Sequence, residues 1–184
     1  MLTVFAGSCN NKSNIKEDIY PSTDSSIFYP VHEYFITQIL KADSISNIRY
    51  TYIDSDNKKD SAIIDFTKFK ELASPFLKDD INDSSIKKYY RESIFHDVTT
   101  ASNTFTYTSV IDTLPLQTLD ILLDTTTDNV KRVFIAKNFR KEDSIVTEKM
   151  GWKTGESFFI NRIILLPGNK ETTQQITVSW SSNY

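Results

Sequence analysis

A series of short, strand-like segments fills the chain from Tyr89 onward and constrains the fold more than any other feature. Seven segments are rich in β-branched and aromatic residues: YRESIFHDVT, NTFTYTSVI, QTLDILLDT, VKRVFIAK, DSIVTEKMGWKT, ESFFINRIILL and QQITVSW. The breaks between them, such as TTASN, TTTDN and PGNKETT, consist mostly of turn-forming and polar residues. Strands spaced by about 8–12 residues and joined by such turns predict a continuous antiparallel meander.

The alternation within these segments predicts a sheet with one covered face and one wet face. In NTFTYTSVI we expect Phe105, Tyr107 and Ile111 to face the core, while the threonines of the same segment face water. Such a sheet needs a cover on its apolar face, and a helix is the usual solution.

A helix is predicted over residues 31–42, in the segment PVHEYFITQILKADS. Pro30 fits the first turn of a helix, where its missing N–H would have no partner. The apolar residues recur at spacings of three and four, which places them on one face: Val31, Tyr34, Phe35, Ile39 and Ala42.

Further elements are expected between this helix and the meander. NIRYTYID and SAIIDF flank the turn DSDNKKD and predict a hairpin. DFTKFKELASPFLKDD then has helical spacing, with Asp65 or Thr67 as the N-cap and Pro75 at its end. Residues 67–88 are therefore interpreted as a helical insertion that forms a flap over one end of the sheet.

Together these elements predict an α+β fold. Its main part is a curved antiparallel β-sheet of seven to nine strands, arranged as a meander and packed on the N-terminal helix. With 184 residues in all, the chain is expected to hold a single α+β domain over residues 30–184.

Composition and charge exclude several classes of function. The net charge is −3 and the basic residues are scattered, which argues against nucleic-acid binding. No apolar run approaches the roughly 18–20 residues that span a bilayer. One cysteine and two distant histidines do not suggest a metal site, and no motif indicates a cofactor.

Cys9, the single cysteine, follows three small residues and precedes a polar stretch. The triplet Ala6-Gly7-Ser8 before the cysteine matches what a signal peptidase accepts, because its cleft excludes bulky side chains. The apolar run Leu2–Ala6 that leads to it is shorter than the roughly 7–15 residues expected of a signal peptide. An ordinary thiol near the N-terminus is the alternative reading. A catalytic nucleophile so close to the start would lack a scaffold to orient it.

Ala6-Gly7-Ser8-Cys9 resembles the lipobox of bacterial lipoproteins. The resemblance implies lipid attachment at Cys9, with residues 1–8 as a truncated signal-peptide remnant and residues 9–29 as a lipidated flexible tether. Ala6 stands where Leu is usual, and no Lys or Arg precedes the apolar run, so we expect a longer native precursor. Because Asn10 follows the cysteine, the resemblance favours the outer membrane of the cell envelope.

Several groups of acidic residues resemble functional sites in composition, but we expect them to have structural roles. The set Asp54, Asp56, Asn57 and Asp60 lacks the glycine and the distal glutamate of a calcium loop. Asp79, Asp80 and Asp83 are expected at a helix N-terminus. The pair Asp124 and Asp128 has the residue types of a glycosidase but sits in a predicted turn.

Structural roles are also expected for a histidine–aspartate pair, two glycines and the two tryptophans. His96 and Asp97 are adjacent in a predicted strand, so their side chains point to opposite faces and form no triad. Gly151 and Gly155 have the wrong spacing for a phosphate loop. Trp152 is expected to close a sheet edge, and Trp152 or Trp180 is the alternative candidate for a sugar-stacking platform.

These observations predict a non-enzymatic cell-envelope lipoprotein that acts as a binding or interaction module. Its expected contacts are the membrane, through the lipid on Cys9, and another envelope protein or a polymer. The alternative is a carrier of an apolar ligand in a cavity between sheet and helix. An enzyme whose catalytic residues form no linear motif is the third hypothesis.

Overall fold

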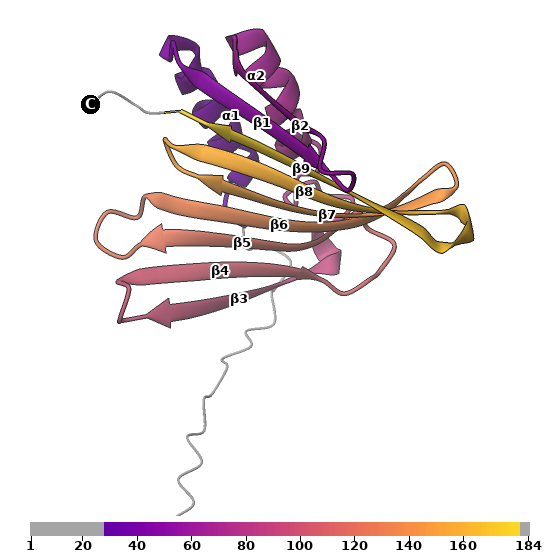
Figure 1. The fold of residues 1–184 in the computed structure, drawn as a ribbon. Helices are drawn as coiled ribbons and strands as arrows, with labels where there is room; N and C mark the ends of the chain where they lie inside the picture. Colours follow the sequence, from indigo (N-terminus) through magenta and orange to yellow (C-terminus); the bar gives the residue numbers. More distant parts are fainter. Residues whose placement is uncertain (1–27, 181–184) are drawn as a thin grey trace, which may run out of the picture.

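The computed structural model describes residues 28–180, which form one nine-stranded antiparallel sheet and two short α-helices (Figure 1). The strands are β1 (Ile48–Asp54), β2 (Lys59–Ile64), β3 (Tyr90–Asp97), β4 (Ser102–Ser109), β5 (Leu116–Asp124), β6 (Val130–Lys141), β7 (Ser144–Lys153), β8 (Ser157–Leu166) and β9 (Lys170–Ser179). The predicted antiparallel sheet, with its number of strands, is confirmed, and an α+β fold is compatible with this arrangement.

The order of the strands is β2-β1-β9-β8-β7-β6-β5-β4-β3. Strands β3 to β9 therefore follow the chain as a meander, and the N-terminal hairpin β1–β2 extends the sheet beside β9. The hairpins turn at two opposite ends of the sheet (Figure 1). We call these the Asp124 end, where β5 stops, and the Asp143 end, where β6 turns into β7.

Helix α1 (Val31–Lys41) packs its apolar face on the middle of the sheet. The ring of Phe35 lies 5.5 Å from that of Trp152 on β7 and 5.1 Å from that of Phe76, measured between centroids. The Phe158 ring of β8 stacks on Trp152 at 5.1 Å. These rings form an aromatic cluster between the helices and the central strands, and the predicted helix is confirmed.

The segment between β2 and β3 contains α2 (Phe66–Ala73) and two 3₁₀ helices, η2 (Ser74–Leu77) and η3 (Lys87–Tyr89). Asp65 caps α2 as expected, because its Oδ1 accepts the N–H of Lys68 at 2.8 Å. Phe69 and Phe76 are buried in the aromatic cluster. The insertion is therefore part of the core and not the flap that the sequence analysis expected.

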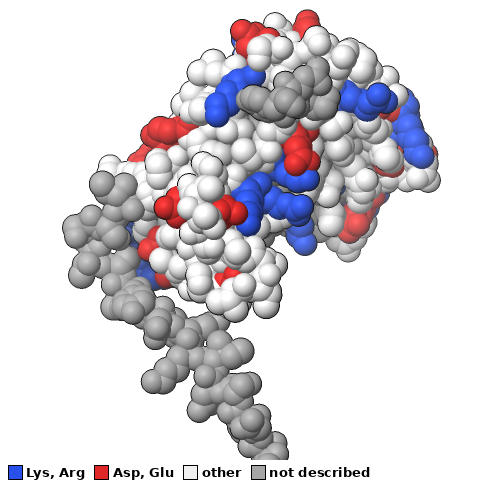
Figure 2. Space-filling model, turned by 90° about the vertical axis from the view of Figure 1, so that its left-hand side faces the viewer, with Lys and Arg blue, Asp and Glu red and all other residues white. Residues whose placement is uncertain are grey.

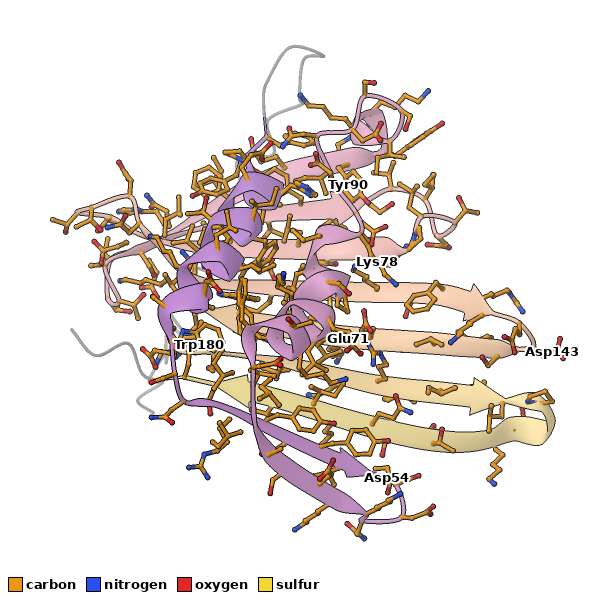
Figure 3. All side chains as sticks on the ribbon, turned by 90° about the horizontal axis from the view of Figure 1, so that it is seen from above. Asp54, Glu71, Lys78, Tyr90, Asp143 and Trp180 are labelled. Carbon is orange, nitrogen blue, oxygen red and sulfur yellow. The ribbon has the colours of Figure 1, made fainter. Side chains whose placement is uncertain are left out.

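The helices cover only part of their side of the sheet (Figure 3). Strands β6 to β9 run on past α2 and η2 toward the Asp143 end, where their helix-side face is uncovered. On β4, Tyr107 is buried in the core and Phe105 packs against it, as predicted. Ile111 lies beyond the end of β4, so it does not continue the alternation.

Phe28 and Tyr29 belong to the folded domain and not to the tether assigned to residues 9–29. Phe28 is buried, and its ring lies 4.8 Å from that of Tyr107. The N–H of Tyr29 donates to Tyr107 Oη at 3.0 Å. Over residues 28–180, no helix has the length and apolar character needed to cross a membrane.

Candidate functional site

Three charged side chains form a row across the helix-side face of the sheet, where η2 ends. Lys137 on β6 is the register partner of Glu148 on β7, and Glu148 is the partner of Arg162 on β8. Their side chains share one face with buried apolar residues two positions away, such as Ile135 and Met150. The charges alternate in sign along this row, which we call the charged row.

Lys137 and Glu148 are the two charged residues buried within the described part of the chain, each with a side chain only 4% exposed. The Lys137 ammonium donates to Asp79 Oδ2 at 2.7 Å and to the carbonyl oxygen of Pro75 at 2.9 Å. Arg162 Nε donates to Glu148 Oε2 at 2.5 Å. A buried charge needs such a partner, because its desolvation is otherwise uncompensated.

A groove of about 650 Å³ lies over the charged row. Its wall on the helical side contains Pro75 and Lys78, which follow α2. Toward the Asp143 end its floor continues into a second row of register partners, Phe139, Val146 and Ile164. The groove is open to solvent, and its floor changes from charged to apolar along the strands.

The groove is basic although the chain carries a net negative charge. Its lining contains five cationic and two acidic residues, although Arg140 is one position out of phase with Lys137 on β6, so that its side chain points to the outer face; both acids are held in the ion pairs of Lys137 and Arg162. Three cations of the lining form no ion pair with a described residue: Lys78, Arg140 and Lys141. The surplus of positive charge favours an anionic group in the groove.

The Asp124 end of the molecule differs in its charge distribution. Figure 2 shows this side of the molecule, where basic and acidic side chains lie interspersed. Lys131 pairs with Asp124 at 2.9 Å, and Lys153 pairs with Glu156. The four side chains are between 27% and 56% exposed, so both pairs are solvated surface contacts.

Three of the acids weighed as site residues end a strand and hold its turn. Asp54 ends β1 and accepts the N–H groups of Asp56 and Lys58. Asp97 and Asp124 end β3 and β5 and accept N–H groups two and three positions further on. The hydroxyl groups of Thr99 and Thr100 also donate to the Asp97 carboxylate, and these bonds, followed by the one from the Thr99 N–H, favour its ionised form and lower its pKa to about 2.

The pKa of Asp124 is likewise lowered to about 2, first by its bond to Lys131 and then by the turn N–H groups. Asp128 lies in the same turn with a positive φ of 54°. Asp128 borders a hollow beside α1 that Asp124 does not line. The two acids shape a hairpin turn, which is the structural role predicted from the sequence.

Asp79, Asp80 and Asp83 do not lie at a helix N-terminus, where the sequence analysis expected them. Asp80 and Asp83 accept N–H groups two positions further on, within turns and not at a helix N-terminus. Asp79 instead pairs with buried Lys137. Of this group, only Asp79 contributes to the groove.

His96 makes a short hydrogen bond with Asn103 across the β3–β4 pair. Asp97, on the opposite face of β3, is bonded to Thr99 and Thr100. The two adjacent residues therefore have separate partners and form no triad, as predicted.

The glycines and tryptophans have structural roles. Gly155 adopts a positive φ of 71° in the β7–β8 turn. At Gly151 a Cβ would lie 2.3 Å from the Phe159 ring, which covers this position on the outer face. Trp152 lies on β7, the middle strand, and is 1% exposed, so the expectation that it closes a sheet edge is wrong. Trp180 is buried too, and neither ring offers a sugar platform.

The charged row was missed at the sequence level although a signal for it exists. Each of the three strands carries a charged residue in the phase of its inward apolar residues, as in Val133-x-Ile135-x-Lys137. Lys137 and Glu148 are also equally far from the β6–β7 turn, which predicts their pairing. Asp79 and Pro75 carry no such signal, because they meet Lys137 only through the packing of the insertion.

Within residues 28–180, no group of three or more His, Cys, Asp or Glu side chains is arranged to hold a metal ion. Cys9, the predicted lipid-attachment residue, lies outside the described residues. Comparison of the chain with protein-family models, with curated proteins and with solved structures found no match.

Proposed function

We propose that this chain is a non-enzymatic lipoprotein of the bacterial cell envelope, which holds a ligand in the basic groove. In this proposal the lipid on Cys9 anchors the protein to the outer membrane, and residues 10–27 connect the anchor to the domain. The curved α+β domain then serves as a rigid scaffold, because its central strands are buried under α1 and α2.

The groove is the observation that supports a binding role. Its two carboxylates are committed to ion pairs, Asp79 with Lys137 and Glu148 with Arg162. Both carboxylates therefore already have a cationic partner within the fold. The groove therefore offers fixed charge and shape to a ligand, and it lacks a pair of free acids for hydrolysis among its lining residues.

The filled centre of the molecule argues against the carrier hypothesis in its original form. The rings of Phe35, Phe76, Trp152 and Phe158 occupy the region between the helices and the central strands. An apolar ligand at that place would have to displace them. The groove lies outside this aromatic cluster and provides apolar surface that a ligand can reach.

Intact mass of the protein from a membrane fraction tests the anchor. The gene is expressed in a bacterial host from its longest upstream start, with Cys9→Ser as the matched variant. We expect cleavage before Cys9 with an added diacyl or triacyl group, and we expect the variant to lose both the lipid and the membrane association. An unmodified wild-type chain that still carries Met1 in the soluble fraction would refute the anchor.

A further inference from the structure

We infer that the groove binds an anionic amphiphile, a molecule with a carboxylate or phosphate head group on an apolar chain. This inference rests on the proposed function, because it names the ligand class of the same groove. Three features carry it: the chemistry of the floor, the free hydrogen-bond donors and the surplus of positive charge.

The floor combines the two surfaces that an amphiphile needs. The charged row and the row of Phe139, Val146 and Ile164 lie two residues apart along the strands, which is roughly 7 Å. Phe139 and Ile164 are only partly buried, although they lie on the helix-side face of the sheet. An apolar chain laid over this second row would remove their surface from water.

Arg162 is positioned to receive the head group. It is bound to Glu148 through Nε, and its two terminal nitrogens make no hydrogen bond with any residue from 28 to 180. The ion pair fixes the guanidinium plane, so these donors are oriented before a ligand arrives. A carboxylate or a phosphate oxygen can accept both of them.

Lys78 and Lys141 add charge from two sides of the groove. Lys78 follows η2, and Lys141 ends β6 near the Asp143 end (Figure 3). Neither forms an ion pair with a described residue. The groove volume of about 650 Å³ falls within the usual range for small-molecule sites.

Isothermal titration of the full-length chain with a matched decyl series tests the ligand class. The probes are decanoate, decyl phosphate, 1-decanol and decyltrimethylammonium, all below their micellar concentrations, together with inorganic phosphate. We expect decanoate or decyl phosphate to bind at least about tenfold more tightly than the neutral and cationic probes. The tighter of the two anions identifies the head group as carboxylate or phosphate.

Variants locate the site. Lys78→Glu combined with Lys141→Glu is expected to lower the affinity for the anionic decyl probes by about tenfold or more. The control combines Lys59→Glu on strand β2 with Lys149→Glu on the outer face of β7; it makes the same charge change away from the groove and should alter affinity by less than about threefold. Ile164→Thr is expected to lower the affinity for both anionic decyl probes by about fourfold, because it removes apolar surface from the second row.

Several results would overturn the inference. Absence of binding by both anionic decyl probes would refute the ligand class. Equal affinities for decyltrimethylammonium and decanoate would show that the charge of the head group does not contribute to binding. An affinity for inorganic phosphate equal to that for decyl phosphate would show that the decyl group does not contribute. Equal losses in the groove and control variants would show an effect of net charge. The mass measurement at Cys9 is independent of all these outcomes, so a failure of the anchor and a failure of the ligand class are distinguishable.

Discussion

Lys137 is a buried lysine that connects the insertion to the sheet through Asp79 and the Pro75 carbonyl. We expect Lys137→Met to lower the free energy of unfolding by about 2–3 kcal/mol, because the Asp79 carboxylate and the Pro75 carbonyl then lose their hydrogen-bond donor. Urea denaturation measures this change. Lys131→Met removes a solvated pair with Asp124 and should cost less than about 1 kcal/mol. Similar losses for both variants would contradict the role given to Lys137.

Asp97 and Asp124 are expected to make the thermal stability of the protein depend on pH. Both have a folded pKa of about 2, below the ordinary value of 3.8. A lowered pKa means that their turn contacts stabilise the fold fully above the ordinary value and are lost as the pH falls through about 2. We therefore expect the Tm of the wild type to fall between pH 4 and pH 2.

The variant with Asp97→Asn and Asp124→Asn serves as the control for this pH dependence. An amide oxygen can still accept the turn N–H groups, but it does not titrate in this range. The variant should start from a lower Tm at pH 5 and lose less of it on acidification. An equally steep fall in both proteins would assign the acid sensitivity to other groups.

At the scale of elements, α1 depends on the face that it turns toward the sheet. Phe35 is 1% exposed inside the aromatic cluster, whereas the neighbouring Ile36 is 40% exposed. We expect Phe35→Ala to lower the free energy of unfolding by about 3–5 kcal/mol, through lost burial and the cavity left among the rings. Ile36→Ala should cost less than about 1 kcal/mol. Urea denaturation of both variants checks the difference, and equal costs would contradict this orientation of α1.

The sequence predicted a helix, a hairpin and a cap correctly where the pattern lies within the element itself. The helix from Val31, the hairpin β1–β2 and the Asp65 cap depend on residues close in the chain. The insertion was misjudged because Phe66, Phe69 and Phe76 indicate an apolar face without indicating its partner. Trp152 was misplaced for the same reason, since its position depends on the strand order and not on its neighbours in sequence.

At the scale of the whole molecule, the sheet is open and ends at β2 and β3. Strand β3 carries two exposed apolar side chains, Ile94 and Phe95, which are 55% and 62% exposed. No described strand pairs with its outer side, so its outward N–H and C=O groups are available to another strand. A second copy of the chain can add a strand there.

Self-association through this edge is testable by light scattering over a concentration series. We expect the mean mass to rise with protein concentration, and Phe95→Lys to suppress the rise, because a charge at an edge opposes strand addition. Phe134→Lys on the inner strand β6 is the matched control, since its side chain is also exposed but its backbone is already paired. If only Phe134→Lys suppressed the rise in mass, the self-association contact would lie on the outer face of the sheet and not at the β3 edge.

The sequence by itself determined the local features of this protein: strand periodicity, turn chemistry, helix faces and the likeness of Ala6-Gly7-Ser8-Cys9 to a lipobox. Each of these depends on residues within a few positions of one another, so it can be recognised without a structure. Tertiary structure alone decided the groove. Lys137 meets Asp79 and Pro75 only because the insertion packs across β6, and the apolar row becomes accessible only because the helices stop short of the Asp143 end. Burial then selects which charges must pair, and it leaves the surplus of positive charge in the groove.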